Sequence, residues 1–179
     1  PVRIAKDKVL MLDMARISIT APRDSGQAVF FLTDQKTGAL SARIPVNSGA
    51  VPVLPGKFNL TRDLSNVTSS ITMKAGQHLE IKAGAIAIAA PKTVQDCNLY
   101  IADQQKKIAA YFRMSQGVQI VLPGSYRVIK RDTGTFSSEI KVIGGQRTVL
   151  SCAAVSASSL GQGRAPYLAL RQSDLAPMV

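Results

Sequence analysis

Few side chains in this sequence could perform acid–base or metal chemistry. His78 is the only histidine, and no group of further ligands or nucleophiles accompanies it, so nothing supports a catalytic triad or a metal site there. Asp34 and Asp103 recur at equivalent points, each directly after an alternating apolar segment. An Asp in that place is typical of an Asx turn. We interpret His78 as an exposed strand residue and both aspartates as turn residues, and we expect no enzymatic activity, no cofactor and no metal.

The two cysteines are Cys97 and Cys152. The sequence contains no Cys-x-x-Cys pair, which argues against a zinc site. An even number of cysteines in a chain of secreted-type composition favours a disulfide bond. Closing a separation of 55 residues (152 − 97) would stabilise the fold by roughly 4 kcal/mol on the chain-entropy model. Two buried free thiols are the alternative.

The net charge is +11, from 22 Lys and Arg against 11 Asp and Glu, and a field of that sign attracts acidic polymers. A solvated basic surface is the alternative interpretation. Stacking aromatic residues do not alternate with the basic ones, so we expect no nucleic acid as partner. The residues that could form a face for an anionic glycan, a lipid headgroup or a cell-wall polymer are Lys57, Arg62, Lys106, Lys107, Arg127, Lys130 and Arg131.

The predicted strands that carry these residues are repeated along the chain. Ala21-Pro22 aligns with Ala90-Pro91, a period of 69 residues (91 − 22), and Leu54-Pro55-Gly56 aligns with Leu122-Pro123-Gly124. Positions that stay apolar in both copies are spaced by two, which is the period of a strand with one buried face. The retained pairs are Ile17 and Ile19 with Ile86 and Ile88, Phe30 and Leu32 with Leu99 and Ile101, Leu40 and Ile44 with Ile108 and Phe112, Phe58 and Leu60 with Tyr126 and Val128, and Ile71 and Met73 with Ile140 and Val142.

We therefore predict an all-β chain of two tandem Ig-like or transthyretin-like antiparallel β-sandwich repeats of about 70 residues, followed by a flexible C-terminal tail. Residues 1–82 form the first unit, with an N-terminal strand or hairpin. Residues 83–154 form the second unit, and residues 155–179 form the tail. A segment that docks on a partner or a sheet edge is the alternative for the apolar residues Tyr167–Leu170.

Turn and junction residues refine this prediction. Each Pro-Gly pair predicts a type II turn, with positive φ at Gly56 and Gly124. Lys74–Gln77 and Ile143–Gln146 predict tight hairpin turns. No run of Ser, Gly or Pro separates the units near Ala83, so we expect a stiff, end-to-end junction.

The N-terminal sequence adds two expectations. Ile4–Leu10 aligns with Met73–Leu79, which would make it the closing hairpin of a preceding unit; an ordinary strand pair is the alternative. No apolar run reaches the ~20 residues that span a bilayer. No signal-peptide pattern opens the chain, so such a signal is absent or already removed.

Leu122–Val128, followed by Glu139–Gln146, resembles the PEGA and carboxypeptidase-regulatory-like β-sandwich repeats of bacterial envelope proteins. The shared pattern is Pro-Gly-x-aromatic-x-aliphatic and then an alternating strand that ends at a Gly turn. The resemblance covers about half of each unit. It implies extracytoplasmic, non-catalytic modules that act as spacers or hold a partner or the cell wall.

These observations favour a non-enzymatic structural or assembly module of a bacterial cell envelope, in the periplasm or outside the cell. Its expected partner is another envelope protein or a neighbouring domain of the same polypeptide. A binding module for an anionic polymer such as peptidoglycan or acidic polysaccharide is the alternative. A hydrolase whose active site the sequence does not reveal is the third hypothesis.

Overall fold

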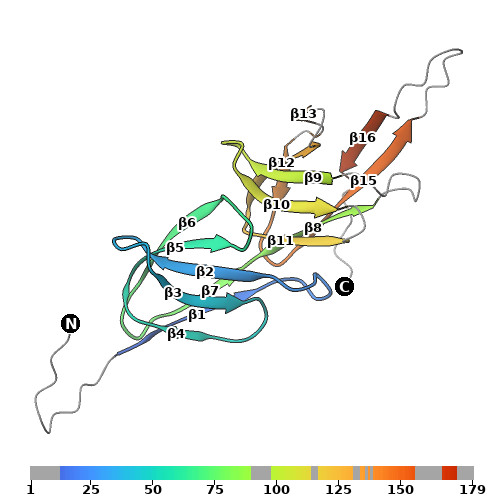
Figure 1. The fold of residues 1–179 in the computed structure, drawn as a ribbon. Helices are drawn as coiled ribbons and strands as arrows, with labels where there is room; N and C mark the ends of the chain where they lie inside the picture. The colour runs from blue at the N-terminus through green and yellow to red at the C-terminus, as the bar shows by residue number, and fades with distance from the viewer. Residues whose placement is uncertain are drawn as a thin grey trace, which may run out of the picture.

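The computed structural model describes residues 13–89, 98–113, 117–130, 134–135, 137, 139–155 and 167–172. Throughout this part of the chain, all regular secondary structure is β-strand. The strands form four sheets, arranged as two units that follow one another from lower left to upper right in Figure 1. The prediction of an all-β chain with two tandem sandwich units is confirmed.

The first unit contains β1 (Ala15–Thr20), β2 (Val29–Asp34), β3 (Leu40–Pro45), β4 (Val51–Val53), β5 (Gly56–Arg62), β6 (Thr68–Met73) and β7 (His78–Lys82). One sheet has the strand order β4-β1-β7, and the other has the order β3-β2-β5-β6. Turns bounded by Gly, Asn and Asp separate the strands, as their tolerance of positive φ allows.

The second unit contains β8 (Gly84–Ala89), β9 (Asn98–Asp103), β10 (Ile108–Arg113), β11 (Val118–Val121), β12 (Gly124–Lys130), β13 (Gly134–Thr135), β14 (Ile140–Val142) and β15 (Arg147–Val155). Its sheets have the orders β11-β8-β15 and β10-β9-β12-β13, with β14 also paired to β12. The strand order of the first unit therefore recurs, with β13 and β14 together in the place of β6, and the sequence repeat is a structural repeat.

Each unit has one parallel strand pair, β1 with β7 and β8 with β15; the other pairs are antiparallel. The predicted hairpins at Lys74–Gln77 and Ile143–Gln146 are wrong, because β6 pairs with β5 while β7 pairs with β1. Both segments are still turns: the N–H of Gln77 donates to the carbonyl of Lys74 at 3.1 Å. They carry the chain from one sheet to the facing sheet. Apolar alternation on both sides of a turn is compatible with such a crossing as well as with a hairpin.

The core follows the predicted alternation. Phe30, Leu32 and Leu60 are fully buried in the first unit, and so are their counterparts in the second. Side chains two apart on a strand point to the same face, so each sheet buries one row of apolar groups against its partner sheet. Leu40 differs from the prediction because 57% of its surface is exposed.

The two Pro-Gly pairs do not form the predicted type II turns, because neither Gly56 nor Gly124 has a positive φ. They are the first residues of β5 and β12. An added Cβ at Gly56 would lie 3.0 Å from Cζ of Phe58, and one at Gly124 would lie 3.4 Å from Cε2 of Tyr126. The aromatic ring two residues on lies over each glycine, which is how an aromatic side chain covers a glycine within a strand.

The structure also differs from the predicted flexible tail at β16 (Tyr167–Gln172). This strand pairs antiparallel with β15, from Leu150 opposite Gln172 to Val155 opposite Tyr167. β15 has nine residues where its counterpart β7 has five. The extra length offers an open sheet edge, and an open edge readily accepts another strand.

The two units are joined through one residue, Ala83, which is completely buried. Its N–H donates to the carbonyl of Thr20 in the first unit at 2.7 Å, and its carbonyl accepts from the N–H of Gly145 in the second at 2.9 Å. The N–H of Ala85 then donates to the carbonyl of Gln146 at 2.9 Å. The β1–β7 ladder thus passes directly into the β8–β15 ladder, in agreement with a stiff junction.

Two glycines allow this close passage. An added Cβ at Gly84 would overlap Cγ1 of Val142 and lie 2.8 Å from the carbonyl oxygen of Ile143. One at Gly144 would lie 2.5 Å from the carbonyl oxygen of Lys82 and 3.2 Å from Cγ of Pro123. The junction therefore requires glycine at both positions, because neither has room for a Cβ atom.

We predict that Gly84→Ala lowers the free energy of unfolding by about 1–3 kcal/mol, because packed backbone must move to admit the methyl group. Gly124→Ala is the matched control, since its Cβ would meet Tyr126 only at ordinary contact distance, and it should change stability by less than about 1 kcal/mol. Urea denaturation of both variants checks this. Equal stabilities would contradict the tight passage at Gly84.

Candidate functional site

The predicted basic face is divided among three places. Lys106 and Lys107 are exposed in the turn between β9 and β10. Arg127 is exposed on β12, opposite Ala102 of β9. β9, β10 and β12, which carry this turn and Arg127, belong to one sheet of the second unit. Lys57 is exposed on β5 of the first unit. Lys130 ends β12, while its side chain and all of Arg131 lie outside the described residues.

Arg62 lies between the units rather than on an exposed face. Nη2 of this half-buried residue donates to Oε1 of Gln119 on β11 at 2.6 Å. Burial lowers the pKa of the guanidinium, and nearby Asp63 partly offsets this effect. Arginine still stays protonated at any physiological pH. Arg62 is therefore a cation that bonds across the junction, and it does not belong to the predicted anion-binding face.

The segment after Arg62 docks on the second unit. The N–H of Asn66 donates to the carbonyl of Ile108 at 2.7 Å, and Oγ of Ser65 donates to the same carbonyl at 3.2 Å. Val67 packs against the core cluster of the second unit. In return, Ile120 and Leu122 of the second unit pack in the core cluster of the first. Apolar side chains of each unit therefore pack at the edge of the other unit's core.

The sequence prediction missed this interface. From the sequence, no role is predicted for Ser65, Asn66 or Ile120, and Leu122 is only part of the repeated Leu-Pro-Gly segment. A signal was present in the repeat: Gln119 and Ile120 stand where the first unit has Val51 and Pro52. That contrast indicates a different environment at the same structural position.

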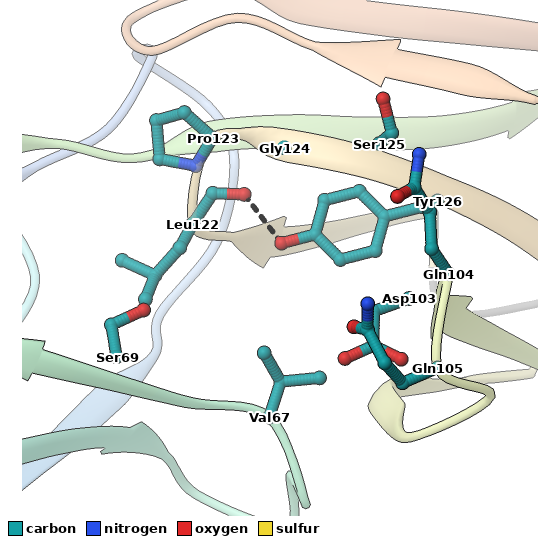
Figure 2. Close-up of a pocket in the computed structure, with 10 residues that line it drawn as sticks. All are labelled: Val67, Ser69, Asp103, Gln104, Gln105, Leu122, Pro123, Gly124, Ser125 and Tyr126. Atoms are coloured by element: carbon teal, nitrogen blue, oxygen red, sulfur yellow. Dashed lines mark hydrogen bonds between the residues drawn. The ribbon is translucent and has the colours of Figure 1, made fainter.

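An open cleft of about 310 Å³ lies beside this interface. Figure 2 shows Val67 and Ser69 on one side and Gln104 and Gln105 on the other. Leu122–Tyr126 form the floor, and the hydroxyl of Tyr126 donates to the carbonyl of Leu122 at 2.7 Å. Burial raises the pKa of Tyr126 to about 12, with the charge of Asp103 adding to the effect.

The cleft offers hydrogen-bonding amides and one carboxylate. Oδ1 of Asp103 already accepts from the N–H of Lys107 at 2.8 Å. Among the residues that line the cleft, no hydrogen bond joins the hydroxyl of Ser69 or Ser125 to the carboxylate of Asp103, the nucleophile–base contact that acyl- or group-transfer chemistry would need. The arrangement can hold water or a small polar group between the units.

The residues first considered for chemistry have structural roles. Oδ1 of Asp34 accepts from the N–H of Lys36 at 2.9 Å and of Thr37 at 2.7 Å, forming the expected Asx turn. The hydrogen bonds from Thr37 are the main cause that lowers the pKa of this carboxyl; Lys36 adds to the effect and desolvation opposes it. His78 is exposed on β7, with Nε2 3.1 Å from Oγ of Ser18.

The predicted disulfide stays a prediction. Cys97 lies outside the described residues, and Cys152 belongs to β15, with its side chain likewise outside them. Within the described ranges, no group of three or more His, Cys, Asp or Glu side chains could hold a metal ion. The same ranges contain no helix of the length and apolarity needed to cross a membrane.

No protein-family model and no curated protein sequence matches this chain. Among solved structures, the Bacillus anthracis TIE protein is 9% identical at a TM-score of 0.30, and the match covers 77% of this chain and 33% of that one. The chain thus spans about a third of that protein's length. A candidate cell adhesion protein of Bacteroides fragilis is 10% identical at a TM-score of 0.30, covering 97% of this chain and 89% of that one. At these scores neither neighbour informs the function of this chain.

Tyr126→Phe should lower the free energy of unfolding by about 1 kcal/mol, because the carbonyl of Leu122 loses its donor. The pKa of Tyr126 is raised from 10.0 to about 12 on folding, so its contribution to stability is complete below pH 10 and is lost as pH rises through about 12. Denaturation at pH 7 and above pH 10 checks both statements. Equal alkaline losses of stability in the two proteins would contradict the second.

Arg62→Ala should lower the free energy of unfolding by about 1–3 kcal/mol, because Gln119 is left unpaired at the junction. Lys57→Ala on the same strand is the control, and as an exposed site it should change stability by less than about 0.5 kcal/mol. Thermal denaturation measures both. An Arg62→Ala protein as stable as the control would show that the bond across the junction contributes nothing.

Proposed function

We propose that this chain is a rigid, non-enzymatic β-sandwich module of a bacterial cell envelope that acts through protein–protein contacts outside the cytoplasm. The observation that carries the proposal is the junction, where Ala83 bonds to both units at 2.7 and 2.9 Å. A two-domain enzyme commonly opens and closes around its substrate. This junction instead holds two sandwiches as one body, as a spacer or scaffold requires.

The interface between the units supports this function. Val67 packs against the core of the second unit, and Ile120 and Leu122 pack against the core of the first. Interfaces between domains that move are generally more polar than this. The resemblance to PEGA and carboxypeptidase-regulatory-like repeats points to the same role and supplies the proposed envelope location. The cleft beside Tyr126 is lined without a nucleophile–base pair.

Residual dipolar couplings of backbone amides test the rigidity. One alignment tensor should fit β1–β7 and β8–β15 together, because the two ladders share Ala83. A variant with Gly-Gly-Ser inserted after Ala83 is the control, and its two units should require separate tensors. Two independent tensors in the natural chain would contradict a rigid module.

Affinity capture from a bacterial envelope extract tests the protein contact. The natural chain should retain a protein that the variant with the Gly-Gly-Ser insertion retains less well, because a rigid scaffold presents both units at a fixed spacing. Mass spectrometry identifies what is retained. Recovery of nothing above a bare-resin control would overturn the proposed function.

A binding module for an anionic polymer is the second candidate. Exposed Arg127 lies on β12, exposed Lys106 and Lys107 lie in the turn between β9 and β10 of the same sheet, and the net charge is +11. Retention on heparin or peptidoglycan at low ionic strength, lost as salt screens the charges, would favour this function. The triple Ala variant at these positions should then elute at lower salt than the natural chain.

A further inference from the structure

The guanidinium of Arg62 carries one N–H donor without an acceptor in the described part of the chain. Its Nη2 donates to Oε1 of Gln119 at 2.6 Å, whereas its Nε is buried and has no hydrogen-bond partner among the described residues. Arginine stays protonated at physiological pH, so this N–H is always present. Buried donors in native proteins are almost always bonded, either to the protein or to an ordered water molecule. The Nε–H of Arg62 therefore requires an acceptor.

A small cavity adjoins Arg62 at the boundary between the two units. Arg62 and Ser65 line it from the first unit and Tyr126 lines it from the second, while its other lining side chains are apolar. Its volume is about 10 Å³, and a cavity of roughly this size holds one water molecule when polar groups face it. A carboxylate or phosphate group is too large for this volume, so water is the ligand that the cavity admits.

The two hydroxyl groups at the cavity can accept hydrogen bonds, but their own protons are already used. The hydroxyl of Tyr126 donates to the carbonyl of Leu122 at 2.7 Å, and Figure 2 shows it directed toward Leu122. Oγ of Ser65 donates to the carbonyl of Ile108 at 3.2 Å and accepts from the N–H of Val67 at 3.0 Å. A hydroxyl oxygen has two acceptor sites, so both oxygens can still accept one further hydrogen bond.

We propose that one water molecule binds in this cavity, where it accepts from the Nε–H of Arg62 and donates to the hydroxyl oxygens of Tyr126 and Ser65. It makes three hydrogen bonds, the number typical of buried water. The one donor and two acceptors of the protein match the one lone pair and two protons that the water uses.

The bound water joins the two units at a second point, beside the bond from Arg62 to Gln119. Arg62 ends β5 and Ser65 follows it, whereas Tyr126 lies on β12. A buried water with three protein partners is costly to remove, so the site adds a polar link to the apolar packing between the units. The site depends on the junction alone and not on what the module binds.

A crystal structure of the chain at a resolution that shows ordered water tests the site directly. One density peak should lie roughly 2.7–3.2 Å from Nε of Arg62 and within hydrogen-bonding distance of Oη of Tyr126. The variant Arg62→Met keeps an unbranched side chain but removes the donor, and its cavity should lack the peak. An empty cavity in the natural chain, or a protein acceptor on Nε, would overturn the proposal.

A double-mutant cycle in solution tests the bond between the water and Arg62. Val67→Ile adds one methylene to a side chain that lines the cavity, so it displaces the water and leaves the Nε–H buried without an acceptor. In the natural chain this change should raise the equilibrium constant for unfolding about tenfold. In the Arg62→Met chain it should have a much smaller effect, because no donor remains to be left unsatisfied.

Val53→Ile is the matched control for this cycle, since Val53 is buried in the first unit and does not line the cavity. Its effect on unfolding should be the same in the natural and the Arg62→Met chains. Equilibrium denaturation in urea measures all of these proteins. Equal effects of Val67→Ile in the two chains would show that no water bonded to Arg62 is displaced, and the proposal would fail.

Discussion

The structure depends on a continuous ladder of backbone hydrogen bonds through Ala83. Its N–H completes the β1–β7 pair at Thr20, and its carbonyl starts the contact with the second unit at Gly145. Buried peptide groups need partners, so the complete burial of Ala83 ties the orientation of one unit to that of the other. A longer linker could satisfy its peptide groups with water and would impose no such constraint.

This constraint explains why two copies of one strand pattern have different residues at matching places. Gly144 occurs where the second unit's backbone lies against the carbonyl oxygen of Lys82 in the first unit, and Gly84 occurs where the start of β8 lies against Val142 and Ile143 of its own unit. Ile120 and Leu122 are apolar and covered because they face the first unit, whereas Pro52 and Leu54 remain at the surface. The two units therefore share their strands because of the repeat. Their side chains differ where one face contacts the other unit and the equivalent face does not.

The roles of the basic residues also depend on whether they face the other unit or solvent. Arg62 was predicted as part of an anion-binding face, yet it is half-buried and bound to Gln119. Arg127 remains exposed on β12, and Lys106 and Lys107 remain exposed in the turn between β9 and β10. A basic residue therefore has one role where its strand ends against the other unit and a different role where its side chain points to solvent. Its type alone does not distinguish the two.

Most strands, their buried faces and the tandem order could be predicted from residue order alone, because alternation with a period of two is a local property, repeated at Phe30 and Leu99 or Leu60 and Val128. The Asx turn at Asp34 could be predicted in the same way, because it depends on neighbours within three residues. The folded chain was needed to show that Lys74–Gln77 crosses between sheets, that Gly56 makes room for Phe58, and that Arg62 bonds to Gln119. These features join residues far apart in the chain or depend on which sheet a strand enters, and no local pattern encodes such distances.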